Sequence, residues 1–167
     1  MLQKDNNIII HITHLLIYIH FNQENGQQSF AVRRSSRWYI WKIHLFGDAL
    51  VQSELVNIEY ARTLVIAIST AGGHGAEYDD DIYDGLQQIF FFLDHLHEGR
   101  SDYSPSFPPQ PLLARRSVEQ IEEEGANEEI DAQLINNGQH VYIMDYRNKA
   151  KGAILNLFIE SSNTKPR

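Results

Sequence analysis

The chain has 167 residues, of which 43% are hydrophobic, a length and composition typical of one globular domain with a sizeable core. It contains no cysteine, which excludes disulfides, thiolate nucleophiles and zinc–thiolate sites. The formal net charge of −8 is uneven. Residues 1–50 carry five Lys or Arg and three Asp or Glu, a net +2, whereas residues 51–167 carry nine and nineteen, a net −10. An acidic body repels nucleic-acid phosphates, so we expect a basic protein partner and no nucleic-acid binding.

The first apolar run is Ile8 to Phe21, which three histidines and a threonine interrupt. It is shorter and more polar than a membrane-spanning helix. A signal peptide would need a positively charged start and a cleavage site of small residues. Neither is present, because Asp5 offsets the charge of Lys4 and no such site follows the run. The run therefore favours a buried strand or helix, with Asn25-Gly26 as a candidate hairpin turn. A membrane tether through this run is the alternative.

Arg33, Arg34 and Arg37 directly precede the aromatic residues Trp38, Tyr39 and Trp41, and arginines beside aromatics can stack on bases or hold phosphates. Because nothing else nearby is basic, a strand from Trp38 to Ile43 with basic flanks is the better interpretation.

Helical spacing becomes clear after this segment. Ser53 is expected to cap a helix that ends at Gly72-Gly73, and Asp79–Asp81 to open a second helix that ends at Gly99. The proline-rich stretch Ser101–Pro111 predicts a surface loop. Three further helices are expected between Ser117 and Glu160, separated by glycine or Asn-Gly stops at Gly125 and Asn137-Gly138. We expect the core of this helical stack to comprise Leu86, Ile89, Leu93, Ile121, Ile130, Leu134, Ile154 and Phe158.

Candidate sites for chemistry are weak. His95 and His97 lie two residues apart, so on a helix they face different sides, and a solvated helix end is favoured over a metal site. The glycine-rich stretch 72–75 lacks the spacing and the lysine of a phosphate-binding loop. Asp79–Asp81 and Glu122–Glu124 leave a metal-dependent enzyme as an alternative function if they converge. No nucleophile motif is present, so we expect neither enzyme activity nor a cofactor.

Several sequence blocks resemble the last armadillo repeats of importin-α, the adaptor of nuclear import. Over residues 59–160, the order and spacing of the blocks carry the resemblance more than any single block does. The blocks are Ala67–Gly73, Asp84–Ile89, Ile121–Gly125, Ile130–Ala132 with Leu134, and Tyr146, Lys149-Ala150, Ile154-Leu155 and Phe158.

The resemblance implies a mainly α fold: a short armadillo-like stack over residues 51–160. Residues 1–50 form a segment of open fold, with a strand favoured at Trp38–Ile43, and residues 161–167 a frayed tail. The resemblance also implies a protein-interaction module in the cytoplasm and nucleus, with a nuclear transport factor as partner. Where the family keeps the tryptophan and asparagine that hold basic cargo peptides, this chain has Ile66 and Thr70. We therefore expect no binding of such peptides at the family's usual strength.

One acidic stretch is the candidate partner-binding surface. Seven acidic residues lie within thirteen positions, a density that repels itself unless water or a basic partner screens it. A solvated helix face is the alternative interpretation. The seven are Glu119, Glu122, Glu123, Glu124, Glu128, Glu129 and Asp131.

Overall fold

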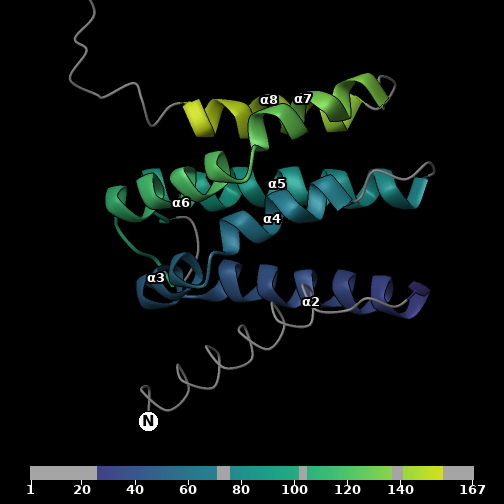
Figure 1. Cartoon of the computed structure of the whole chain (residues 1–167). Helices are drawn as coiled ribbons and strands as arrows, with labels where there is room; N and C mark the ends of the chain where they lie inside the picture. The colour runs from purple at the N-terminus through teal and green to yellow at the C-terminus, as the bar shows by residue number, and fades with distance from the viewer. Residues whose placement is uncertain (1–25, 71–75, 102–104, 137–140, 156–167) are drawn as a thin grey trace, which may run out of the picture. The chain divides into compact units, whose positions relative to one another are not determined.

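The computed structural model describes residues 26–70, 76–101, 105–136 and 141–155, and these are mainly helical, as predicted (Figure 1). The described residues form no named strand; a single backbone bridge joins Arg100 to Phe107. The helices are α2 (Gly26–Phe46), α3 (Ala49–Asn57), α4 (Tyr60–Thr70), α5 (Ala76–Glu98), α6 (Pro111–Glu123), α7 (Ala126–Asn136) and α8 (Val141–Leu155).

Some predictions fall outside the described residues. These are the apolar run 8–21, the glycine-rich stretch 72–75, the Asn137-Gly138 stop, Phe158 and the tail after residue 160. Leu134 lies on α7, but its side chain is not described.

The chain divides into two compact units, which we describe separately. The first combines residues 1–60 with 100–108, and the second combines residues 61–99 with 109–167. We call them the α2–α3 unit and the α4–α8 unit. The predicted segments 1–50 and 51–160 divide the chain at different points.

The predicted strand at Trp38–Ile43 is wrong, because these residues lie within the long helix α2. The hairpin turn at Asn25-Gly26 is also wrong, since Gly26 is the first residue of that helix. In a strand, Trp38 and Ile40 would share one face. In the structure Ile40 is buried together with Ser36 and His44, at the four-residue spacing of a helix, whereas Trp38 is exposed. Burial at that spacing overrides the strand preference of the aromatic and β-branched residues.

The corner between α2 and α3 is tight. A Cβ atom on Gly47 would lie 2.3 Å from a side-chain carbon of Val51 and 2.7 Å from the carbonyl oxygen of Ile43, so only glycine fits. Asp48 then caps α3, because its carboxylate accepts hydrogen bonds from the backbone amides of Leu50 and Val51, each at 3.0 Å. The predicted cap at Ser53 is therefore wrong: α3 begins four residues earlier, at Ala49.

The end of α2 is held by the buried guanidinium of Arg100. Its Nη1 donates to the carbonyl oxygens of His44 at 3.1 Å and Leu45 at 2.7 Å, its Nη2 to those of Gly47 and Pro105, and its Nε to that of Pro105 at 2.9 Å. The carbonyls in the last turn of a helix have no partner within the helix, and a cation there complements the helix dipole. One side chain thus joins the loop after Arg100 to the end of α2.

The single helix predicted from Ser53 to Gly72 is interrupted. α3 stops at Asn57, and Glu59 adopts a positive φ of 59° before α4 begins. The left-handed conformation that ends a helix is most often adopted by glycine, so a glutamate gives no sequence signal of the break.

The α4–α8 unit is built around α5, which packs most extensively against α8 and next against α6. Gly85 permits a close approach of α4 and α5, because a Cβ there would lie 2.7 Å from the Ile68 side chain. Six of the predicted core residues are confirmed as buried: Leu86, Ile89, Leu93, Ile121, Ile130 and Ile154.

The predicted glycine stops are confirmed where the structure describes them. Gly99 follows α5 with φ 78°, and Gly125 separates α6 from α7 with φ 75°. α5 begins at Ala76, three residues before Asp79, and α6 begins at Pro111, the last residue of the predicted loop. Arg100 and Phe107 close that loop by exchanging backbone hydrogen bonds of 2.8 and 2.9 Å.

Candidate interaction surface

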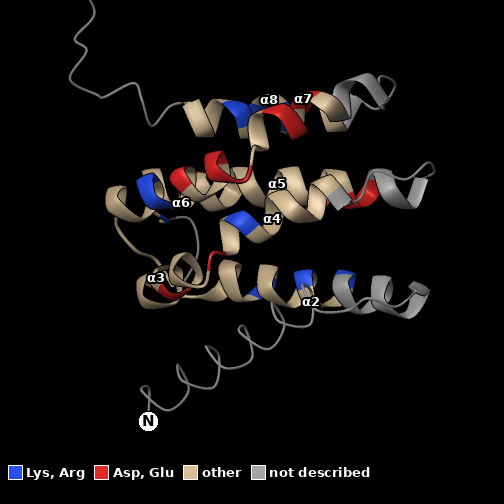
Figure 2. Cartoon of the chain, in the orientation of Figure 1, with Lys and Arg blue, Asp and Glu red and all other residues tan. Residues whose placement is uncertain are grey.

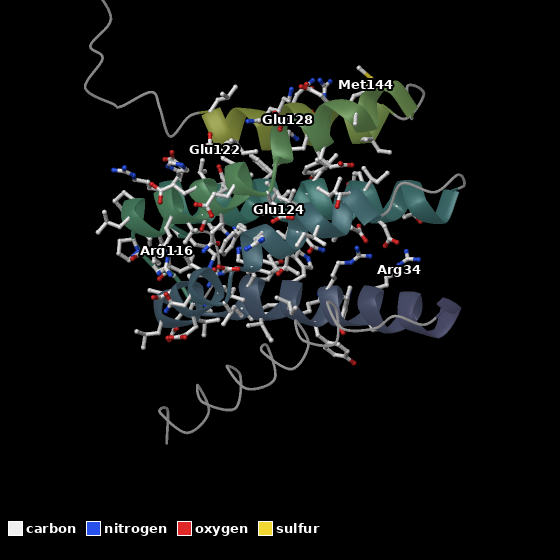
Figure 3. The ribbon with its side chains drawn as sticks, viewed as in Figure 1. Arg34, Arg116, Glu122, Glu124, Glu128 and Met144 are labelled. Atoms are coloured by element: carbon white, nitrogen blue, oxygen red, sulfur yellow. The ribbon has the colours of Figure 1, made fainter. Side chains whose placement is uncertain are left out.

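The predicted acidic surface lies on α6, α7 and the turn between them, where Figure 3 labels Glu122, Glu124 and Glu128. Its members differ in their partners. Glu119 pairs with Arg115, one turn earlier on α6, at 3.0 Å. Glu124 accepts a hydrogen bond from Arg62 of α4 at 2.6 Å, and this ion pair ties the α6–α7 turn to α4. These two carboxylates are therefore neutralised within the unit.

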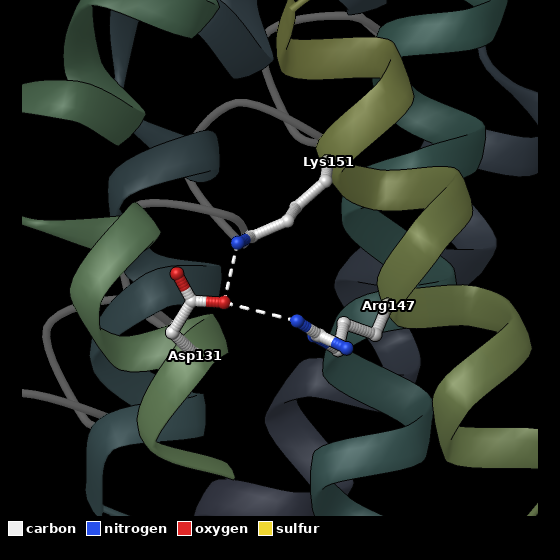
Figure 4. Close-up of polar contacts among 3 residues, drawn as sticks. All are labelled: Asp131, Arg147 and Lys151. Atoms are coloured by element: carbon white, nitrogen blue, oxygen red, sulfur yellow. Dashed lines mark hydrogen bonds and ion pairs between the residues drawn. The ribbon is translucent and has the colours of Figure 1, made fainter. Parts of the chain in front are cut away.

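Asp131 is neutralised by two cations from the neighbouring helix (Figure 4). Arg147 and Lys151, one turn apart on α8, both donate to the same carboxylate oxygen, Arg147 at 3.0 Å. These hydrogen bonds, that of Lys151 first, hold the pKa of Asp131 below its usual range. Asp131 is exposed, but Arg147 and Lys151 offset its charge, and these ion pairs join α7 to α8.

Three of the seven acids remain exposed with no ion pair to any described residue: Glu122, Glu123 and Glu128. We call them the acidic triplet. Figure 2 shows the acidic residues of α6 and α7 on either side of the turn. The predicted surface is thus narrower than the sequence indicated, because Glu124 and Asp131 pair with basic residues of α4 and α8, and Glu119 pairs with Arg115 of its own helix. Glu129 is half-buried.

Two residues of the triplet occupy an unfavourable position. Glu122 and Glu123 lie in the last turn of α6, which contains no basic residue. The C-terminal end of a helix carries partial negative charge, so a carboxylate there typically costs about 0.3–1 kcal/mol. Glu128, in the first turn of α7, lies at the end of a helix that favours negative charge. The stability of α6 therefore does not explain Glu122 and Glu123.

The other candidate residues are dispersed. His95 is buried, which corrects the expected solvated helix end: its ring lies 6.0 Å from that of Phe91, one turn earlier. On α5, Asp80 is exposed and Asp81 is buried. Across the described ranges, no three His, Asp or Glu side chains are grouped so that they could hold a metal ion.

The two positions at which peptide-binding residues were expected from the resemblance lie on α4. Ile66 is half-buried, and Thr70 is the last residue of the helix.

A second surface was missed by the sequence analysis. Trp38, Tyr39 and Phe46 are exposed on α2, at 54%, 56% and 64% of their full accessibility. The signal was present, because Trp38, Lys42 and Phe46 are spaced four residues apart and so share one side of a helix. The strand interpretation concealed it.

In comparison with known proteins, no family model, curated protein or solved structure matches the chain. Among the described residues, no helix is both long enough and apolar enough to cross a membrane.

Proposed function

We propose that this chain is a protein-interaction module, not an enzyme, and that the acidic triplet Glu122, Glu123 and Glu128 binds a basic surface on a partner protein. From the resemblance of residues 59–160 to importin-α, we infer a short armadillo-like stack that acts in the cytoplasm and nucleus, with a nuclear transport factor as partner. Ile66 and Thr70 replace the family's cargo-binding residues, so the proposal assigns no binding of basic cargo peptides to α4.

The observation that carries the proposal is the placement of Glu122 and Glu123. Both are exposed, both lie at the helix end that disfavours carboxylates, and no described cation pairs with either. A basic partner surface would neutralise them and Glu128 together. Because exposed charges contribute to association mainly through steering and orientation, the complex should form quickly and should weaken with salt.

The test is affinity capture from cell extract with the full chain as bait. The wild type is compared with a triple variant that carries Glu122→Lys, Glu123→Lys and Glu128→Lys. The matched control reverses three exposed acids elsewhere, Asp80, Glu59 and Glu98, and so changes the net charge equally. We expect proteins with basic surfaces to be retained by the wild type and the control but lost from the triple variant.

Two results would oppose the proposal. Identical partner sets for the wild type and the triple variant would show that the acidic triplet is only a solvated helix end. Equal loss from the triple variant and the control would show that net charge, not this surface, governs retention. Circular dichroism of all three proteins establishes that each is folded.

A further inference from the structure

The exposed aromatic residues of α2 form a continuous stripe along one side of the helix. Trp38, Lys42 and Phe46 follow one another at intervals of four residues, and Tyr39 lies beside them. The Lys42 ammonium lies 4.9 Å from the Trp38 ring centre and 5.8 Å from that of Phe46, and the Trp38 and Tyr39 rings meet edge-on at 5.4 Å. We call Trp38, Tyr39, Lys42 and Phe46 the aromatic stripe.

The stripe is separate from the part of α2 that is already buried. Ser36, Ile40 and His44 define the buried side, and Trp38 and Phe46 project from the other. Each large aromatic side chain can bury about 150–250 Å², so three exposed rings on adjacent turns are a substantial apolar surface. Contiguous apolar surface of this kind usually marks a contact with another segment or molecule.

We propose that the apolar run Ile8–Phe21 of the same chain covers the aromatic stripe. The run supplies ten apolar residues among fourteen and no Asp, Glu, Lys or Arg. It therefore offers apolar side chains to the rings and no charge to repel or pair with Lys42. Only residues 22–25 separate it from Gly26, where α2 begins, and a connection of this length suits a chain that turns back along a helix.

The reach of the run agrees with this assignment. Trp38 lies twelve residues into α2 from Gly26, which is about 18 Å along the helix axis. Fourteen residues span about 21 Å at the rise of a helix and about 46 Å when extended. The run therefore reaches Trp38 and Tyr39 in either conformation. Phe46, about 30 Å from Gly26, comes within reach of a helical return only if residues 1–7 take part.

The experiment uses fluorescence quenching in the full chain. Because the chain has no cysteine and only two tryptophans, Trp41→Phe leaves Trp38 as the single reporter, and Thr13→Cys gives one labelling position inside the run. A bimane label at position 13 quenches tryptophan emission only at close range. We expect it to remove most of the Trp38 emission. The same label at Asn163→Cys, in the C-terminal tail, should leave the emission almost unchanged.

A second variant keeps the proposal falsifiable. Ile12→Asp with Leu16→Asp places two carboxylates in the run, and we expect it to restore the emission and to increase quenching of Trp38 by acrylamide. Circular dichroism checks that the helices remain. Unquenched emission from the Thr13 label in the folded parent chain would overturn the proposal.

Two further experiments test whether a second copy of the chain covers the aromatic stripe or the run Ile8–Phe21 binds a membrane instead. If mixing a labelled chain that lacks both tryptophans with the unlabelled reporter chain produces the quenching, a second copy covers the stripe and the proposal is wrong. If emission is unquenched in solution and the chain binds phosphatidylcholine–phosphatidylserine vesicles through residues 8–21, the run is a membrane tether and the proposal is again wrong. We expect no quenching in the mixture and no binding to vesicles.

Discussion

The α2–α3 unit and the α4–α8 unit are stabilised by different kinds of contact. In the first, the buried guanidinium of Arg100 binds carbonyl oxygens of His44, Leu45 and Gly47, more than fifty residues earlier in the chain. In the second, α5 packs through apolar side chains on α8 and α6. The first unit therefore adds a buried polar contact to an apolar core that includes Ile40, Leu55 and Val56, whereas the contacts of α5 in the second are mainly apolar.

The two units also differ in the residues that they expose to solvent. α2 carries arginines and lysine with no acidic residue, and its aromatic stripe is exposed. The turn between α6 and α7 carries the acidic triplet, whose members have no described ion-pair partner. Exposed aromatic rings favour stable packing against another apolar segment. Exposed carboxylates favour reversible binding of a partner, with an affinity that depends on salt.

The largest effect is expected in the apolar core of the α4–α8 unit. Leu93→Ala removes a fully buried side chain of α5 and should lower the free energy of unfolding by about 2–5 kcal/mol. Leu112→Ala on α6 is the control, because Leu112 is 82% exposed and its truncation should have little effect. Urea denaturation compares the two. Equal midpoints would contradict the packing of α5.

Next in size is the polar contact of the α2–α3 unit. Arg100→Met keeps the length of the side chain but removes its hydrogen bonds to the end of α2, and we expect a loss of about 2–4 kcal/mol. Arg100→Lys retains the charge without the planar fork and should lose an intermediate amount. Denaturation followed by circular dichroism measures both. An Arg100→Met protein as stable as the wild type would mean that this unit, too, depends on apolar packing.

The glycines of the α4–α8 unit give a smaller effect with an internal control. Gly85→Ala forces a methyl group against Ile68 and should cost about 1–3 kcal/mol. Gly152→Ala on α8 meets nothing within 4 Å and should stabilise the helix by about 0.5–1 kcal/mol. Opposite shifts of the melting temperature are expected. Shifts of the same sign would show that α4 and α5 do not approach as closely as described.

A smaller change in stability is expected at the two helix ends that have a left-handed backbone conformation. Glu59→Gly relieves a positive φ and should stabilise by about 1 kcal/mol, and Gly125→Ala imposes the same strain and should destabilise by a similar amount. Thermal denaturation of both variants tests the pair. A destabilised Glu59→Gly protein would place the break between α3 and α4 elsewhere.

The sequence predicted the α4–α8 unit better than the α2–α3 unit for a physical reason. Apolar spacing is local, so Leu86, Ile89 and Leu93 identify the buried face of α5 without knowledge of its neighbours. Glycine at a helix end is also a local signal, and Gly99 and Gly125 were placed correctly. At the α3–α4 break the residue with positive φ is Glu59, and the prediction of one continuous helix failed.

Two features could be recognised only from the folded structure. The strand predicted at Trp38–Ile43 rested on residue preference, whereas burial of Ile40 and His44 selects the helix. Of the seven predicted acids, Glu124 and Asp131 acquire partners from α4 and α8, which their spacing in the sequence does not reveal. The acidic triplet is what remains after packing.

The most direct test of the proposed function is the affinity of a captured partner for the full chain, measured as the salt concentration rises. From about 0.1 M to about 1 M salt the Debye length falls from about 10 Å to about 3 Å. We predict that the wild-type Kd rises steeply over this range. At low salt, the Kd of the Glu122→Lys, Glu123→Lys, Glu128→Lys variant should be higher than that of the wild type. It should change little as the salt concentration rises. The same Kd and the same salt dependence for both proteins would contradict the proposal that the acidic triplet binds the partner.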